Sequence, residues 1–411
     1  MATSVALDQS LPPKPAHPLR DPMFRKWWIG ASISLVGDQF YLVALPWVIL
    51  QLTGSAVAMG TIMMLAAVPR AVLMLLGGAV SDRFSPRRIM MTTASARTLF
   101  VAAIGVLLWL HQLQLWHLYL LAFAFGTADA FGAPAASTFL PFLVKKEQLL
   151  AANSVFQSTA QITTIATPGP AGLVIKAFGA VWAFLLDAVS FLFIIGALWQ
   201  LPDPPQATGP VKKPPVWCSI VEGIGHVYGD VPLRSLMTLV AVINFCLAGP
   251  MTVGLAYLAK QKFGSPAAYG VLISSIAAGG LAGALLAGVW KPRRRGVLML
   301  CVATVLALGL GSIGLLHGLW QISCALVVMG ISAGVTNIQI ISWVQKRVEQ
   351  SVRGRVMSVL MFLSLGLMPV SLAVAGVLAQ WSLKGLFLLG AGALLVVTGA
   401  GAMQKTVREI E

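Results

Sequence analysis

The sequence predicts an all-α integral membrane protein with twelve transmembrane helices arranged in two six-helix halves. Apolar residues make up 58% of the 411 residues, charged residues make up only 10%, and the mean hydropathy is +0.85. A soluble domain has about 45–50% apolar and about 25% charged residues, so a lipid bilayer must cover much of this chain. Apolar stretches of spanning length recur twelve times, and a polar, proline-rich segment separates the sixth from the seventh.

Each predicted span contains roughly 20 or more residues, which is the length that crosses the hydrocarbon core of a bilayer. The predicted spans are 27–51, 57–80, 89–110, 116–142, 151–176 and 179–200 in the first half, and 234–259, 267–290, 297–316, 319–345, 356–380 and 384–403 in the second. The chain therefore divides into a disordered N-terminal tail (1–23), a first half (24–200), a linker (201–233), a second half (234–403) and a C-terminal tail (404–411). We expect the amphipathic stretch from Trp217 to Tyr228 to form an interfacial helix within the linker.

The distribution of lysine and arginine predicts the orientation of the helices. With the N-terminus placed in the cytoplasm, the cytoplasmic segments carry 22 of the 28 Lys and Arg residues. The loops on the opposite side carry four, namely Lys176, Lys260, Lys262 and Lys384. Because cytoplasmic loops are enriched in these residues, we expect both termini and the linker to be cytoplasmic, in a bacterial inner membrane.

Several other classes of protein are excluded by the same composition. The net charge of +15 arises from short loops between spans and not from one basic face, so it does not indicate a nucleic-acid partner. The four cysteines and five histidines are scattered, so we expect no metal site and no disulfide framework. The sequence lacks metalloprotease, hydrolase and nucleotide-binding motifs, and we therefore predict no enzyme activity and no cofactor.

A motif follows the second span, where residues 78–88 read Gly-Ala-Val-Ser-Asp-Arg-Phe-Ser-Pro-Arg-Arg. The spacing of the glycine, the Asp-Arg pair and the basic pair resembles the cytoplasmic loop signature of the major facilitator superfamily. The resemblance implies the major facilitator fold, secondary transport, and a gate in which Asp82 makes contacts between the halves that hold the outward-open state. The implied gate residues are Gly78, Asp82, Arg83, Arg87 and Arg88. Pro86 stands where the family usually has glycine, and the matching loop of the second half, 291–295, lacks the aspartate.

Further segments resemble one branch of that superfamily, the macrolide-efflux-type drug:proton antiporters and the related siderophore exporters. These segments are Gly37-Asp38-Gln39-Phe40, Ala44-Leu45-Pro46-Trp47, Pro69-Arg70, Gly169-Pro170-Ala171-Gly172, Asp187-Ala188-Val189-Ser190-Phe191 and Arg353-Gly354-Arg355-Val356. The resemblance implies export rather than uptake. The two halves also resemble each other in sequence, because the basic loops that begin at Lys145 and Lys346 lie 201 positions apart. This spacing is typical of a duplicated six-helix unit.

Five ionisable residues lie inside the predicted spans, and all five lie in the first half: Asp38, Arg70, Arg97, Asp129 and Asp187. A charge in the membrane is costly, so each indicates a function. Asp38 and Asp129 lie near the middle of their spans and are the candidates for proton coupling. Arg70, Arg97 and Asp187 are the expected charge partners, and Asp187 with an arginine is equally compatible with a structural pair. Two ion pairs would leave one of three carboxylates unpaired and able to take up a proton.

The predicted spans of the second half carry only neutral polar groups, and Asn244, Asn337 and Gln339 are the candidates for the substrate cavity. Such a surface suits a bulky, lipophilic substrate. We therefore expect a monomeric, proton-coupled exporter of lipophilic or amphiphilic small molecules. The alternatives are a siderophore exporter, a lysophospholipid flippase on the same fold, and a membrane receptor or scaffold that does not transport.

Overall fold

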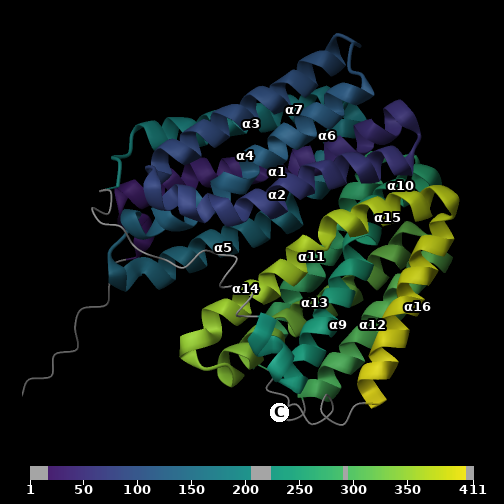
Figure 1. Ribbon diagram of the computed structural model, residues 1–411. Helices are drawn as coiled ribbons and strands as arrows, with labels where there is room; N and C mark the ends of the chain where they lie inside the picture. The colour runs from purple at the N-terminus through teal and green to yellow at the C-terminus, as the bar shows by residue number, and fades with distance from the viewer. Residues whose placement is uncertain (1–16, 205–223, 290–294, 404–411) are drawn as a thin grey trace, which may run out of the picture.

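The computed structural model describes residues 17–204, 224–289 and 295–403, and every regular element in this part of the chain is helical (Figure 1). The elements of the first half are η1 (Pro18–Arg20), α1 (Pro22–Thr53), α2 (Ala56–Arg83), α3 (Pro86–Trp109), α4 (Leu115–Leu143), η2 (Lys146–Gln148), α5 (Leu149–Ala166), α6 (Pro168–Phe178) and α7 (Ala180–Trp199). Those of the second half are α9 (Val231–Gly249), the π-helix η3 (Pro250–Gly254), α10 (Leu255–Leu258), the π-helix η4 (Ala259–Phe263), α11 (Pro266–Val289), α12 (Arg295–Leu315), α13 (Leu319–Arg347), α14 (Gln350–Gly366), α15 (Met368–Trp381) and α16 (Leu383–Met403).

Within the described residues, eleven helical stretches are long and apolar enough to cross a membrane. They coincide with eleven of the predicted spans. The remaining span, 151–176, is divided into α5 and α6 at Thr167. Pro168 follows directly, and proline interrupts a helix because it lacks the amide hydrogen and its ring clashes with the preceding turn. The two pieces together cover the predicted span, and the prediction of an all-helical protein with twelve spans is confirmed.

The two halves repeat the same local breaks. The eleventh span is divided at Leu367, just before Pro369, and Pro369 lies 201 positions after Pro168. This offset equals that of the basic loops. Each half also begins with a helix capped by an aspartate, because Asp21 accepts a hydrogen bond from the first turn of α1 and Asp230 accepts one from the first turn of α9. These correspondences support a duplicated unit.

The packing order of the helices also repeats. In the first half α1 packs on α7, α2 packs on α4, and α3 packs on both α4 and α7. The second half repeats this order with α9 on α16, α11 on α13, and α12 on both α13 and α16. Glycines allow the closest approaches, since a Cβ on Gly126 of α4 would lie 2.0 Å from the carbonyl oxygen of Ala66 in α2. Small residues are expected at such contacts, because in lipid close packing replaces the hydrophobic effect as the main attraction.

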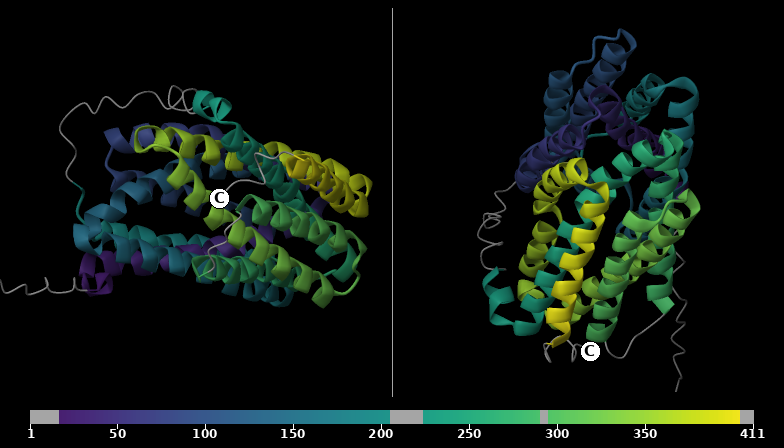
Figure 2. Two further views of the ribbon diagram at one scale, coloured as in Figure 1. Left: turned by 90° about the horizontal axis from the view of Figure 1, so that it is seen from below. Right: turned by 90° about the vertical axis from the view of Figure 1, so that its right-hand side faces the viewer.

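The two halves meet mainly through two helix pairs, α2 with α15 and α6 with α11 (Figure 1). The right-hand view of Figure 2 shows the first half above the second. The contacts gather at one end of the molecule, which we call the tight end and which carries Ala56, Pro168 and Pro266. Two of the described hydrogen bonds that cross between the halves lie there. The amide of Ala56 donates to Oε1 of Gln380 at 2.7 Å, and Nζ of Lys260, in η4, donates to the carbonyl oxygen of Leu50.

The predicted linker and tails lie only partly within the described residues. Residues 224–229 are helical and end just before α9, which agrees with the last part of the predicted interfacial helix. The rest of that helix, from Trp217 to Gly223, is outside the described ranges, as are residues 1–16 and 404–411 of the two tails.

Candidate transport site

Four of the five charged residues inside the membrane form one cluster, which we call the charge cluster: Asp38, Arg70, Arg97 and Asp129. Arg97 of α3 is at its centre, with Nη2 paired to Oδ1 of Asp38 on α1 and Nη1 3.7 Å from Oδ1 of Asp129 on α4. Nε of Arg70, on α2, lies 3.2 Å from Oδ2 of Asp129. The four side chains therefore form a row of ion pairs in which negative and positive charges alternate, in the order Asp38, Arg97, Asp129 and Arg70. Four helices of the first half contribute one residue each.

Burial makes these ion pairs strong. The side chains of Arg97, Asp129 and Asp38 are 17%, 21% and 24% exposed, whereas that of Arg70 is 57% exposed. Attraction between charges rises as the local dielectric constant falls, so the pair of Arg97 with Asp38 is held more firmly than the pair of Arg70 with Asp129. Removal of one partner of a buried pair costs ~3–5 kcal/mol, because the other charge remains without compensation.

Two phenylalanine rings enclose the guanidinium group of Arg97. Its Cζ lies 4.7 Å from the ring centroid of Phe125 on α4 and 4.4 Å from that of Phe191 on α7. Ring faces attract cations, and the planar guanidinium group stacks on them where an ammonium group would not. The rings hold Arg97 between the carboxylates. Phe191 lies in the Asp187–Phe191 segment that resembles the exporter branch, and Phe125 has no sequence signal because it is one of 18 phenylalanines.

Asp187 departs from the prediction that it would pair with an arginine. Its side chain is fully buried, and it forms no ion pair with any cation in the described part of the chain. Oδ1 lies 3.4 Å from the hydroxyl of Ser190, which itself donates to the carbonyl oxygen of Asp187 at 2.7 Å. Oδ2 has no hydrogen-bond partner among the described atoms. Asp38 and Asp129 take the two Nη groups of Arg97, and its Nε has no described acceptor.

The loop after α2 is only partly described. Gly78, Asp82 and Arg83 belong to the last turns of α2, and the contacts of this stretch lie outside the described part of the structure. Two residues of the motif, Arg87 and Arg88, form ion pairs with Asp203 at 3.4 and 3.5 Å, and Arg87 also donates to the last carbonyls of α7. The Ser85 hydroxyl, which donates at 2.8 Å, and then these arginines hold the pKa of Asp203 below its usual value. In this conformation Arg87 therefore binds the end of α7 and the start of the linker, and Arg88 binds the same linker residue.

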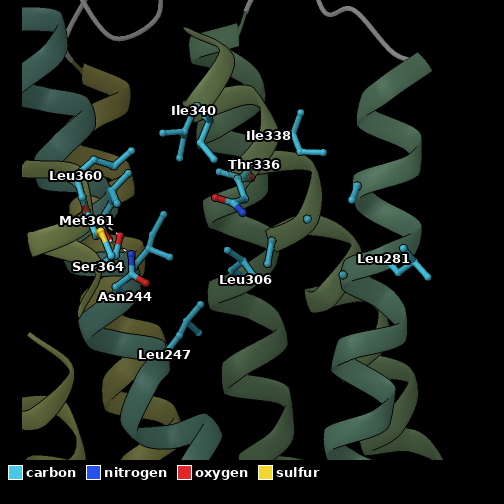
Figure 3. A pocket seen from close by; sticks show the side chains of 18 of the residues that line it. Asn244, Leu247, Leu281, Leu306, Thr336, Ile338, Ile340, Leu360, Met361 and Ser364 are labelled. Atoms are coloured by element: carbon cyan, nitrogen blue, oxygen red, sulfur yellow. Dashed lines mark hydrogen bonds between the residues drawn. The ribbon is translucent and has the colours of Figure 1, made fainter. Parts of the chain in front are cut away.

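The second half lines a cavity of about 910 Å³ (Figure 3). Asn244 and Asn337 contribute amide groups to its wall, and Nδ2 of Asn244 donates to the carbonyl oxygen of Val240 at 2.9 Å. Gln339 does not line this cavity and is buried in α13. Gln161 of α5 is the first-half residue in the lining. The rest of the wall is mainly apolar, with members such as Ile243, Leu247, Leu306, Ile341, Met357 and Met361.

The family of the chain follows from its sequence over these same helices. The family model described as the Major Facilitator Superfamily matches residues 27–369. The chain belongs to the Major Facilitator Superfamily. This match confirms the resemblance drawn from the loop after the second span, and it covers the charge cluster and the cavity. The chain is thus a membrane transporter and not an enzyme.

Named relatives within the Major Facilitator Superfamily are exporters. The chain is 29% identical over 366 residues to the multidrug efflux pump Tap of Mycolicibacterium fortuitum, covering 85% of this chain and 88% of that protein. It is 25% identical over 339 residues to the enterobactin exporter EntS of Shigella flexneri, covering 82% and 80%. Among solved structures, the nucleoside transporter NupG superposes with a TM-score of 0.77 at 13% identity, covering 93% and 98%. The similarity to NupG shows only that the two proteins share a fold.

Proposed function

We propose that this protein is a secondary active exporter of bulky lipophilic or amphiphilic small molecules and is driven by proton exchange. The observation that carries the proposal is the pairing of a large, mainly apolar cavity in one half with buried charges in the other. Relatives that are named for drug efflux and for enterobactin export support the direction of transport.

The cavity supports the substrate class. Its volume of about 910 Å³ lies at the upper end of the ~300–1,000 Å³ usual for small-molecule sites. Its wall offers amide and hydroxyl groups, and the described residues of the lining include no charged one. A sugar would need many hydrogen-bond partners there, whereas a large molecule with few polar groups would not. Asn244 and Asn337 are the polar groups that we propose orient the substrate.

The charge cluster supports coupling to protons. Only a group that gains and loses a proton during the cycle can couple transport to a proton gradient, and the intramembrane acids of the described chain lie in the first half. We propose that Asp38 and Asp129 belong to this coupling machinery, with Arg97 as their shared cation and Arg70 as a weaker second partner. Rocking of the halves would change which carboxylates Arg97 contacts.

The charge distribution supports an orientation with the tight end outside. Lys176, Lys260, Lys262 and Lys384 lie toward this end, and it is the end with few positive charges. The described conformation is then inward-facing, with both termini in the cytoplasm of a bacterial inner membrane. Arg87 and Arg88 would lie at the cytoplasmic end, and we propose that the 78–88 segment, at the junction of α2 and α3, contacts the other half only when that end closes.

This orientation predicts which sites a membrane-impermeant thiol reagent can reach. In a variant with the four native cysteines replaced by serine, Lys384→Cys is expected to react in intact cells. Lys145→Cys is expected to react only after permeabilisation, because both lysines are exposed but lie at opposite ends. The measurement is the labelled fraction with and without permeabilisation. The reverse pattern would invert the topology and make the described state outward-facing.

Transport into inside-out membrane vesicles tests the function. With an acidic vesicle interior, the parent protein is expected to accumulate radiolabelled erythromycin, a bulky lipophilic probe, and a protonophore should abolish the accumulation. Enterobactin serves as a second probe, because one relative is named as its exporter. Accumulation of enterobactin alone would favour siderophore export. If neither probe accumulates above the level of vesicles without the protein, the proposal is wrong, and a receptor or scaffold becomes the better explanation.

A further inference from the structure

Asp187 lies directly beside the charge cluster but is not paired with it. A Cβ on Gly37 of α1, the residue before Asp38, would lie 2.6 Å from Oδ1 of Asp187. On α7, Phe191 follows Asp187 by one helical turn, and its ring contacts the guanidinium group of Arg97. Asp187 thus faces the backbone that carries Asp38 and shares a helix face with a residue that touches Arg97.

Asp187 and Arg97 each keep one unpaired polar atom, and the two atoms are complementary. Arg97 uses its two Nη groups for Asp38 and Asp129, and its Nε is buried without an acceptor. Oδ2 of Asp187 is buried without a donor. Buried polar groups normally have partners, so one free donor and one free acceptor in neighbouring residues indicate an arrangement that changes during function.

The charge balance assigns the protonation of these groups. Asp38 and Asp129 carry two negative charges, and Arg70 and Arg97 carry two positive charges, so the charge cluster is neutral. An ionised Asp187 would add an uncompensated charge at a fully buried position inside the membrane, where such a charge is strongly disfavoured. The neutral carboxylic acid avoids this cost.

We infer that Asp187 carries the exchangeable proton in this conformation, and this inference rests on the proposed proton-coupled export. After the proton leaves, the carboxylate of Asp187 accepts a hydrogen bond from Nε of Arg97. The new pair would draw Arg97 away from Asp38 and loosen the contact between α1 and α3. One proton leaves Asp187 toward one side of the membrane, and one proton from the other side restores it, so one proton crosses per cycle.

The other groups around Asp187 are consistent with this assignment. Helices α1, α3 and α6 pack against α7. The titratable groups that interact with Asp187 through their charge are Asp38 and Tyr41 on α1 and Arg97 on α3. The charged residue of α6 is Lys176, which is exposed near the tight end. The hydroxyl of Tyr41 is buried without a described partner, and it can offer hydrogen bonds but no positive charge. Arg97 is therefore the cation available to Asp187 once its proton has left.

Infrared spectroscopy of the purified full-length protein tests the assignment without transport. At neutral pH the parent should show the C=O stretching band of a protonated carboxyl group. Asp187→Asn should lose the band, and Asp187→Glu should keep it at a shifted frequency, which guards against loss through misfolding. Asp203→Asn is the matched control and should keep the band, because Ser85, Arg87 and Arg88 hold Asp203 ionised. A band that persists in Asp187→Asn, or no band in the parent, would overturn the inference.

Transport by the same variants supplies an independent measurement. Asp187→Asn should lose gradient-driven accumulation of erythromycin by about tenfold or more, a change of ~1.4 kcal/mol in driving free energy. It should retain exchange of labelled for unlabelled substrate, because its neutral side chain mimics the protonated state. Accumulation at the parent level would contradict the inference. If the parent itself transports neither probe, the proposed function fails, whereas the infrared result still decides where the proton lies.

Discussion

Replacement of Asp38 by asparagine is expected to abolish accumulation of substrate against its gradient, by about tenfold or more, while exchange of labelled for unlabelled substrate continues. The substitution removes one negative charge from the neutral cluster and leaves Arg97 with Asp129 at 3.7 Å as its described carboxylate partner. Asp187 would then stay ionised as a permanent partner of Arg97. No group would be left to exchange a proton, so substrate can still cross but a pH gradient cannot drive it.

Asp129→Asn is the matched control for Asp38→Asn and should have a smaller effect. Asp129 lies farther from Arg97 than Asp38 does, and its second partner, Arg70, is 57% exposed and therefore solvated without it. Both variants would be compared with the parent in vesicles with an imposed pH gradient. Parent-level accumulation by both would show that coupling does not depend on these carboxylates, and the carrier would then be uncoupled or driven by another ion.

The number of spans and the presence of charges in the membrane could be predicted from the sequence, because each depends on the hydropathy of a single stretch. The partners of those charges could not. Arg97 lies 59 positions from Asp38 in the chain, and only the packing of α3 between α4 and α7 decides that it serves two aspartates while Asp187 has none. Counting three acids and two bases correctly indicated one unpaired carboxylate but could not identify it.

The residues that line the cavity could likewise be predicted only in part from the sequence. Asn244 and Asn337 could be proposed from the sequence because polar residues are rare in these spans, and both line the cavity. Gln339 follows Asn337 by two positions, and two helical positions turn a side chain by about 200°. It therefore points into the packed face of α13. The close helix approaches at the tight end were not predicted, because they involve the backbone of residues such as Gly270 and Pro168, which have no polar signature in the sequence.

Those backbone contacts predict that a large side chain at Gly270 will force the tight end open. A Cβ on Gly270 of α11 would lie 2.1 Å from the carbonyl oxygen of Pro168 in α6, and one on Gly172 would lie 2.4 Å from that of Pro266. A carbonyl in a helix cannot turn aside as a flexible side chain can. Gly270→Leu should therefore disfavour the closed tight end by ~1–3 kcal/mol or more, which shifts the balance of the two states by about 5–150-fold.

Spin labels on cysteines that replace Lys176 and Lys384, both exposed at the tight end, should move apart in Gly270→Leu, and labels at Lys145 and Lys346 should approach each other. Gly126→Leu is the matched control. Its Cβ would meet a carbonyl at 2.0 Å, but α2 and α4 belong to the same half, so it should lower the melting temperature without moving the labels. Because the glycines differ in which helices they join, the pair of variants separates closure between halves from packing within one half. Unchanged tight-end distances in Gly270→Leu would show that α6 and α11 do not form the closing contact.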